Sequence, residues 1–190
     1  MTSSAVDPVR LAGERRRIFL ALFSALAIAL HALEFLLPSP VPWFRLGFAN
    51  IFALLALFLY DGRAAWSVNM VRIVVASLFL GTFFSPRFFL SLSGGILATL
   101  AMTTSRKLGG EKIGPVGVSV LGACGHSVGQ LLCAWWLIVR HDGVWFLLPP
   151  LLLIALVTGI INGFVADALL QRLRRHPPFE DITDGAHSDV

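Results

Sequence analysis

Apolar residues run through this chain in six long blocks, separated by short stretches of charged residues, glycine or proline. The blocks cover about residues 17–37, 46–60, 64–84, 88–105, 115–139 and 144–173. A helix needs roughly 20 apolar residues to cross the hydrocarbon core of a bilayer. The pattern therefore predicts an all-α polytopic membrane protein with about six transmembrane helices in one bundle.

The remaining segments complete this organisation. We expect residues 1–16 to be a disordered cytoplasmic N-terminus, residues 17–175 the transmembrane domain, and residues 176–190 a disordered cytoplasmic tail. The alternate prolines Pro38, Pro40 and Pro42 favour extended backbone after the first helix. Pro149-Pro150 predicts a kink in the last helix. The arginines at 15–17 also suit a signal sequence, but no A-x-A-like cleavage site follows, which favours a retained first helix.

Composition agrees with a membrane protein. The 190 residues are 56% hydrophobic and 14% charged, whereas soluble domains contain about 25% charged residues. The net charge of +4 does not indicate nucleic-acid binding, because the basic residues lie at the ends of apolar blocks, where they determine topology.

The basic residues also predict an orientation. Of the 15 Lys and Arg residues, eleven fall on one side of a six-span arrangement: Arg10, Arg15, Arg16, Arg17, Arg63, Arg106, Lys107, Lys112, Arg172, Arg174 and Arg175. Arg45, Arg87 and Arg140 fall on the other side. This bias predicts cytoplasmic termini and location in the inner membrane of a bacterium. A reporter fused after Arg175 should be active in the cytoplasm, and activity only outside it would overturn the orientation.

Arg72 is the most unusual residue within a block. An arginine at the centre of a spanning helix costs about 2.5–3.5 kcal/mol on insertion scales. Asn69 lies three residues earlier and shares its helix face. The pair is a candidate ligand site facing an interior cavity, for an anionic ligand or a buried carboxylate. Alternatively, the helix is shifted and Arg72 extends to the interface.

A second polar pair lies in the fifth block. His126 and Gln130 are four residues apart, so they point the same way, with Ser119 and Ser127 nearby. They either bond to a neighbouring helix or line a ligand cavity. Glycines at 122, 125 and 129 form a stripe that lets another helix approach closely.

Further candidate ligand-binding residues come from other blocks. Glu34, Arg45 and Asn50 could converge at the outer end of the bundle, with Glu34 paired to Arg45 or Arg72; an interfacial position suits Glu34 as well. Asn162 shares a face with Thr158 in the sixth block.

The first block carries small residues at Ala21, Ala25 and Ala29. Alanine is common in spanning helices, so the spacing arises readily by chance. The alternative is a smooth docking surface for a partner membrane protein.

Several catalytic motifs are missing from the sequence. It contains no G-x-x-x-x-G-K-[ST] for ATP and no D-D-x-x-D cluster for a magnesium-bound diphosphate. Cys124 and Cys133 are too far apart on one helix for a disulfide and show no metal-ligand spacing. We therefore expect no enzyme activity, no metal and no resident cofactor.

Four stretches together resemble one family. They are residues 45–51 (RLGFANI), 91–95 (SLSGG), 113–131 (IGPVGVSVLGACGHSVGQL) and 156–159 (LVTG). The chain resembles the Gx transporter family, whose members are also labelled heptaprenyl diphosphate synthase component I. The resemblance implies a six-helix domain similar to the substrate-binding S components of energy-coupling-factor transporters, whose first helix docks on a membrane coupling subunit.

Three functions remain open at this point. The first is a small-molecule transport component without its own ATPase, whose ligand is vitamin-, flavin- or quinone-like and whose partners are membrane coupling subunits. The second, which the family label suggests, is a non-catalytic membrane subunit of isoprenoid or quinone synthesis. The third, also implied by the resemblance, is a scaffold for a flavin-based membrane redox complex, which pull-down of flavoprotein subunits without a bound ligand would favour.

Overall fold

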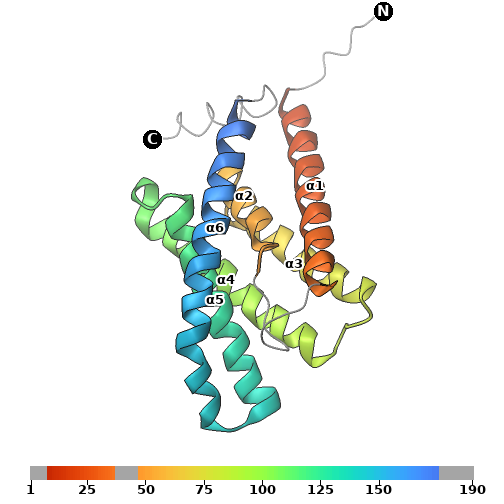
Figure 1. The fold of residues 1–190 in the computed structure, drawn as a ribbon. Coiled ribbons are helices and arrows are strands. Elements are labelled where there is room, and N and C mark those ends of the chain that lie inside the picture. The colour runs from red at the N-terminus through yellow and green to blue at the C-terminus, as the bar shows by residue number, and fades with distance from the viewer. Residues whose placement is uncertain (1–7, 37–46, 176–190) are drawn as a thin grey trace, which may run out of the picture.

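A computed structural model of the chain describes residues 8–36 and 47–175, with six α-helices and no strand in these ranges (Figure 1). The helices are α1 (Pro8–Leu36), α2 (Asn50–Leu59), α3 (Gly62–Phe79), α4 (Pro86–Gly109), α5 (Pro115–Ala134) and α6 (Leu148–Arg174). Short helical turns lie between them: η1 (Gly110–Lys112), the π-helical η2 (Trp135–Val139) and η3 (Asp142–Leu147). The predicted all-α fold with six helices is confirmed.

Local sequence signals explain where most helices begin. Asp61 precedes α3 and accepts a hydrogen bond from the Ala64 N–H at 2.7 Å. Ser85 accepts from the Phe88 N–H before α4 in the same way. Proline occupies the first turn of α4, α5 and α6, where its missing N–H costs nothing. Pro149-Pro150 lies in the first turn of α6, directly after η3, so the helical segment predicted from Val144 changes from 3-10 to α-helix beside these prolines.

Two other boundaries differ from the predictions. Helix α1 begins at Pro8 and not near Arg17, because proline suits the first helical position and the Arg17 guanidinium pairs with Glu14 at 3.3 Å. Helix α3 ends at Phe79, since Gly81 and Phe84 adopt φ of 63° and 58°, which a helix cannot accommodate. Residues 8–16, predicted to be disordered, are helical in α1, so that part of the prediction is wrong. The rest of the predicted disordered N-terminus (1–7), the tail 176–190, the proline-rich segment and Arg45 lie outside the described residues.

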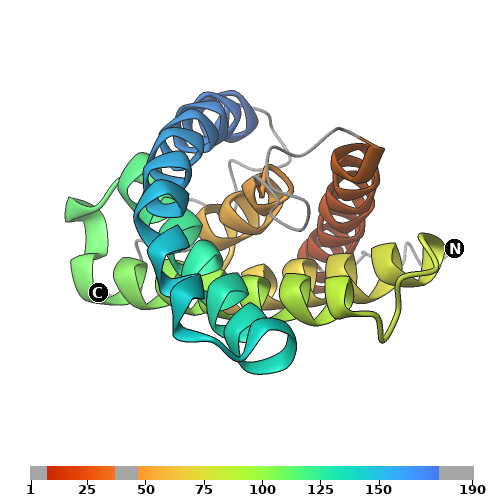
Figure 2. The same cartoon turned by 60° about the horizontal axis from the view of Figure 1, so that its bottom comes forward.

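Helix α2 is the centre of the molecule (Figure 2). It packs against each of the other five helices, and only Phe52 and Phe58 among its ten residues are not buried. At 1.5 Å per residue it is about 15 Å long, half the thickness of a hydrocarbon core. Helix α2 therefore begins inside the bundle and does not cross a membrane by itself.

Helices α5 and α6 form a long hairpin that packs through glycine. A Cβ added to Gly159 would lie 2.8 Å from the Val120 Cα, and one added to Gly163 would lie 2.5 Å from the Val116 Cα. The opposite face of α6 exposes apolar side chains, among them Phe164 at 63%. Close backbone contact inside and apolar side chains outside are what a helix in lipid requires.

Four helical segments in the described ranges are long and apolar enough to cross a membrane. They are Leu11–Phe35, Pro86–Gly109, Pro115–Val139 and Asp142–Arg174. Helix α1 begins and α6 ends at the same end of the molecule (Figure 1). An even number of crossings is consistent with this arrangement.

Candidate functional site

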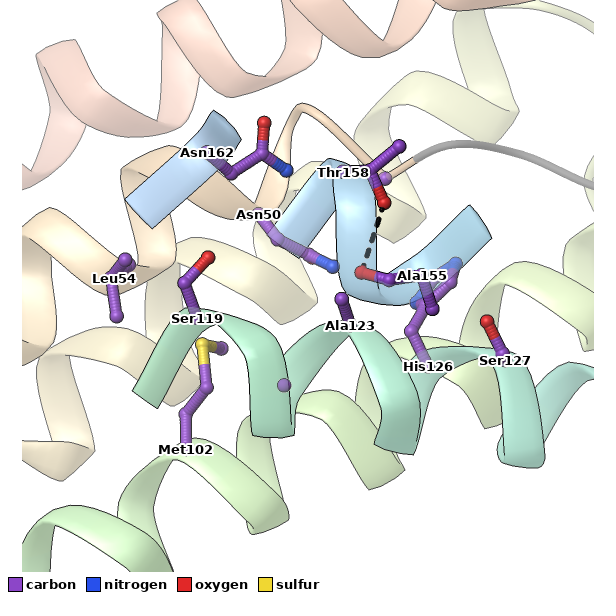
Figure 3. A pocket seen from close by; sticks show the side chains of 12 residues that line it. Asn50, Leu54, Met102, Ser119, Ala123, His126, Ser127, Ala155, Thr158 and Asn162 are labelled. Carbon is purple, nitrogen blue, oxygen red and sulfur yellow. Dashed lines mark hydrogen bonds between the residues drawn. The ribbon is translucent and has the colours of Figure 1, made fainter. Parts of the chain in front are cut away.

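A small cavity with polar and apolar lining residues lies at the start of α2, between α2, α5 and α6 (Figure 3). It leaves about 10 Å³ for the centre of a water molecule, which is the space that one water needs. Its lining residues come from four helices and the turn before α2: Gly47, Asn50, Leu54, Met102, Ser119, Gly122, Ala123, His126, Ser127, Ala155, Thr158 and Asn162.

The turn before α2 brings its first residue to this cavity. The N–H of Asn50 donates to the Gly47 carbonyl at 3.0 Å, and Gly47 has a φ of +74°, which glycine adopts without strain. A Cβ on Gly47 would lie 3.2 Å from the Asn50 Nδ2 and 3.8 Å from the His126 Cδ2. Glycine at 47 thus allows the turn to lie directly against the His126 ring.

His126 is held on its other side by α4. A Cβ on Gly94 would lie 2.9 Å from the His126 Nδ1 and 2.9 Å from the Gln130 Cγ. His126 and Gln130 are both buried, and the predicted common face of α5 therefore packs against Gly94. His126 lines the cavity, whereas Gln130 does not.

Helix α6 closes the cavity with Thr158 and Asn162. The Thr158 hydroxyl donates to the Ile154 carbonyl at 3.0 Å, which uses its proton within the helix. Asn162 is 4% exposed. Gly159, beside them, lets this face of α6 lie close to α5.

Three buried amide oxygens accept no hydrogen bond from the part of the chain that the structure describes. They belong to Asn50, Gln130 and Asn162. Leaving a buried acceptor without a donor costs about 1–3 kcal/mol. Asn50 and Asn162 are both among the residues that line the cavity, and they come from two separate helices.

Arg72 and Asn69 belong to a different network, between α3 and α4. The Arg72 Nη2 donates to the Asn69 Oδ1, and the Asn69 Nδ2 donates to the Gly95 carbonyl at 2.9 Å and to the Thr99 hydroxyl. A Cβ on Gly95 would lie 3.1 Å from the Asn69 Nδ2. Gly94 and Gly95 thus face α5 and α3 respectively, and the two predicted polar pairs lie against different sides of α4.

Glu34 reaches the N-terminal end of α2. Its carboxylate accepts a hydrogen bond from the Ala49 N–H at 3.2 Å. A carboxylate is stabilised at a helix N-terminus, where backbone N–H groups lack partners within the helix. The predicted partner Arg45 lies outside the described residues, so that pairing stays a prediction.

The structure thus brings Asn50, His126 and Asn162 together and leaves Arg72 and Asn69 out of the cavity. Five lining residues were not predicted from the sequence: Gly47, Leu54, Met102, Ala123 and Ala155. Gly47 lies within the stretch 45–51 that carries the family resemblance, which was a usable signal. Met102 has no sequence feature that distinguishes it from other residues of α4.

The family model described as heptaprenyl diphosphate synthase component I matches residues 23–169. This chain belongs to that family. The resemblance drawn from the four sequence stretches is therefore confirmed.

A solved structure supports the fold. The match comes from a study titled "Structure and mechanism of the S component of a bacterial ECF transporter", with a TM-score of 0.66 at 19% identity. It covers 85% of this chain and 96% of that one. No curated protein sequence shows a significant match to the chain. With its apolar helices and this fold, the chain is a membrane protein.

Proposed function

We propose that the chain is the membrane-embedded, ligand-binding component of a small-molecule transporter. Both termini would lie in the cytoplasm and the protein in the inner membrane. An ATP-hydrolysing partner would supply energy, since the sequence has no phosphate-binding loop of its own. The chain would also have no catalytic role, because its sequence lacks an acidic cluster that could hold a magnesium-bound diphosphate.

The two unsatisfied acceptors of Asn50 and Asn162 carry this proposal. They come from helices α2 and α6, far apart in sequence, and both side chains are at least nine-tenths buried along one cavity. Buried polar groups in folded proteins are nearly always hydrogen-bonded. A ligand that donates to both acceptors would replace the water that fits there.

The lining also limits the chemistry of the ligand. No Asp, Glu, Lys or Arg is among the described lining residues. A buried charge without a charged partner is strongly unfavourable. The ligand group in this cavity would therefore be uncharged, with N–H or O–H donors for the two amides and apolar atoms against Leu54 and Met102.

Binding requires the cavity to widen. Sites for drug-sized molecules have volumes of about 300 Å³ or more, whereas this cavity admits one water. The Gly47 turn and the first turn of α2 contact both His126 and the cavity, so outward movement of this turn would enlarge it.

The test is to purify the protein in mild detergent and identify small molecules that co-purify by mass spectrometry. We expect Asn162→Leu to reduce ligand occupancy at least about tenfold. Leucine has no hydrogen-bond acceptor, so the ligand loses one hydrogen bond to the protein. Gln171→Leu is the matched control, since Gln171 is an exposed amide on the same helix. Equal occupancy in both variants, with unchanged thermal unfolding, would reject the cavity as the site.

The family description favours a second function, a non-catalytic membrane subunit of isoprenoid or quinone synthesis. Deletion of the gene would then change quinone levels or side-chain length without changing the uptake of any small molecule. A change in uptake alone would favour the transporter.

A further inference from the structure

A second, larger cavity lies at the end of the molecule where α4 and α6 finish. It has a volume of about 260 Å³ and opens between the end of α2, the end of α4, the start of α5 and the end of α6. Its main lining residues are Phe58, Arg106, Ile113, Asp167, Leu170 and Arg174. None of these lines the cavity at the start of α2.

Arg106 is held in a fixed position at this cavity. Its Nη1 donates to the Gly110 carbonyl at 2.5 Å, and its Cζ lies 4.7 Å from the centroid of the Phe58 ring. A guanidinium has five N–H donors, and the bond to Gly110 uses one of them. The half-buried Arg106 side chain is therefore oriented in advance to donate to an anion.

The cavity carries a net positive charge. Arg106 and Arg174 line it together with one carboxylate, Asp167, whose Oδ2 accepts from the Gln171 Nε2 at 2.9 Å. Lys107 and Arg172 add positive charge in the last turns of α4 and α6. An anion with several oxygens would be attracted here, and guanidinium groups bind phosphate oxygens in bidentate geometry.

Apolar side chains locate the cavity at the depth of the lipid headgroups. On α6, Phe164 and Leu169 are exposed at 63% and 36%, and the charged residues Arg172 and Arg174 follow within about one turn. On α4, Leu100 is 49% exposed, and the charged residues Arg106 and Lys107 follow within about two turns. This change from lipid-facing apolar to charged surface marks the edge of the hydrocarbon core.

We propose that this cavity binds the phosphate of an anionic phospholipid, with Arg106 and Arg174 as its ligands. Basic pockets between transmembrane helices are known recognition sites for anionic headgroups. Phe58, Ile113 and Leu170 would contact the apolar part of the same lipid at the base of the cavity.

The test titrates phosphatidylglycerol or phosphatidylcholine into the purified full-length protein in neutral detergent and counts bound lipids by native mass spectrometry. We expect preferential binding of phosphatidylglycerol, and the double variant R106Q/R174Q should bind it about 30-fold more weakly. The control is R15Q/R63Q, which removes the same charge from exposed residues that do not line the cavity and that the proposed site does not use.

Three outcomes would overturn the proposal. An equal loss in the control variant would mean that lipid follows diffuse surface charge and not this cavity. Equal binding of both lipids would remove the preference for an anion. If inorganic phosphate alone displaced the lipid at equal concentration, the site would belong to a soluble phosphate compound. Thermal unfolding of R106Q/R174Q and its single variants shows whether lost binding reflects lost folding.

Discussion

Buried polar residues in this protein are of two kinds, and their hydrogen bonds separate them. The Asn69 amide uses both its donor and its acceptor, to Gly95, Thr99 and Arg72, so it holds α3 to α4. The amide oxygens of Asn50 and Asn162 find no donor among the described residues. An amide that is fully hydrogen-bonded within the protein, such as Asn69, is suited to stabilising the fold. An amide whose oxygen has no donor, such as those of Asn50 and Asn162, is suited to binding a ligand.

This distinction predicts different effects of substitution at Asn69 and at the cavity. Asn69→Leu should lower the free energy of unfolding by about 1–3 kcal/mol, because it removes the acceptor that the buried Arg72 guanidinium uses. Thr99→Val removes only neutral hydrogen bonds and should cost about 1 kcal/mol. Denaturant unfolding in detergent measures both. An effect of Asn69→Leu no larger than that of Thr99→Val would contradict a structural role for the Arg72 contact.

At the scale of elements, the α2–α3 junction is held by one acidic residue. Asp61 caps α3 through Ala64 and accepts from the Arg16 Nη2 at 2.7 Å, which connects the start of α1 to this junction. Burial raises the pKa of Asp61, but the Ala64 N–H and the Arg16 guanidinium outweigh it and hold the pKa below its ordinary value. Burial also raises the pKa of neighbouring Tyr60, whose ring lies 5.6 Å from the Arg16 Cζ.

The lowered pKa predicts a pH dependence of stability. Because the folded-state pKa of Asp61 is below the unfolded value, its contribution is complete above about pH 4–5 and is lost as pH falls through the folded pKa. Asp61→Asn keeps a good helix cap and loses only the exposed ion pair, whereas Asp61→Ala should cost about 1 kcal/mol through the lost cap. The difference in unfolding temperature between wild type and Asp61→Asn should be constant from pH 7 to about 5 and shrink below about pH 4. A difference that grows in acid would contradict this assignment.

At the scale of the whole molecule, the two faces of α1 have different surroundings. Phe23, Ala27 and His31 are buried against the bundle, whereas the predicted docking residues Ala21, Ala25 and Ala29 are all exposed. No described helix covers the alanine face, so it is open to a partner in the membrane or to lipid. The structure leaves both possibilities for this face in place.

Docking through the alanine face predicts an effect that is separate from ligand binding. Ala25→Trp should reduce co-purification of partner membrane proteins at least about tenfold, because small residues allow the close helix approach that an indole prevents. Ligand occupancy should not change, since Ala25 does not line the cavity. Ala168→Trp, on the exposed face of α6, is the matched control. Equal partner recovery from both variants, by quantitative mass spectrometry, would mean that the alanines only face lipid.

Most of the helical architecture could be predicted because its signals are local. Block length and hydrophobicity predicted six helices, and the described starts of α4, α5 and α6 follow from proline or a capping serine within a few residues. The largest boundary error was in α1, expected at about 17–37 and observed at Pro8–Leu36. Helix α2, expected at about 46–60, is observed at Asn50–Leu59, because the Gly47 turn lies against His126.

The sequence by itself determined that this chain resides in a membrane, how many helices it forms and which residues share one helix face. Helical spacing correctly paired Asn69 with Arg72 and His126 with Gln130, since three- and four-residue separations depend on one helix alone. Only the tertiary structure decided that α4 lies between these pairs, with Gly94 against one and Gly95 against the other. The rotation of a helix relative to its neighbours depends on side-chain contacts across the bundle, and these also determine which amides meet in the cavity.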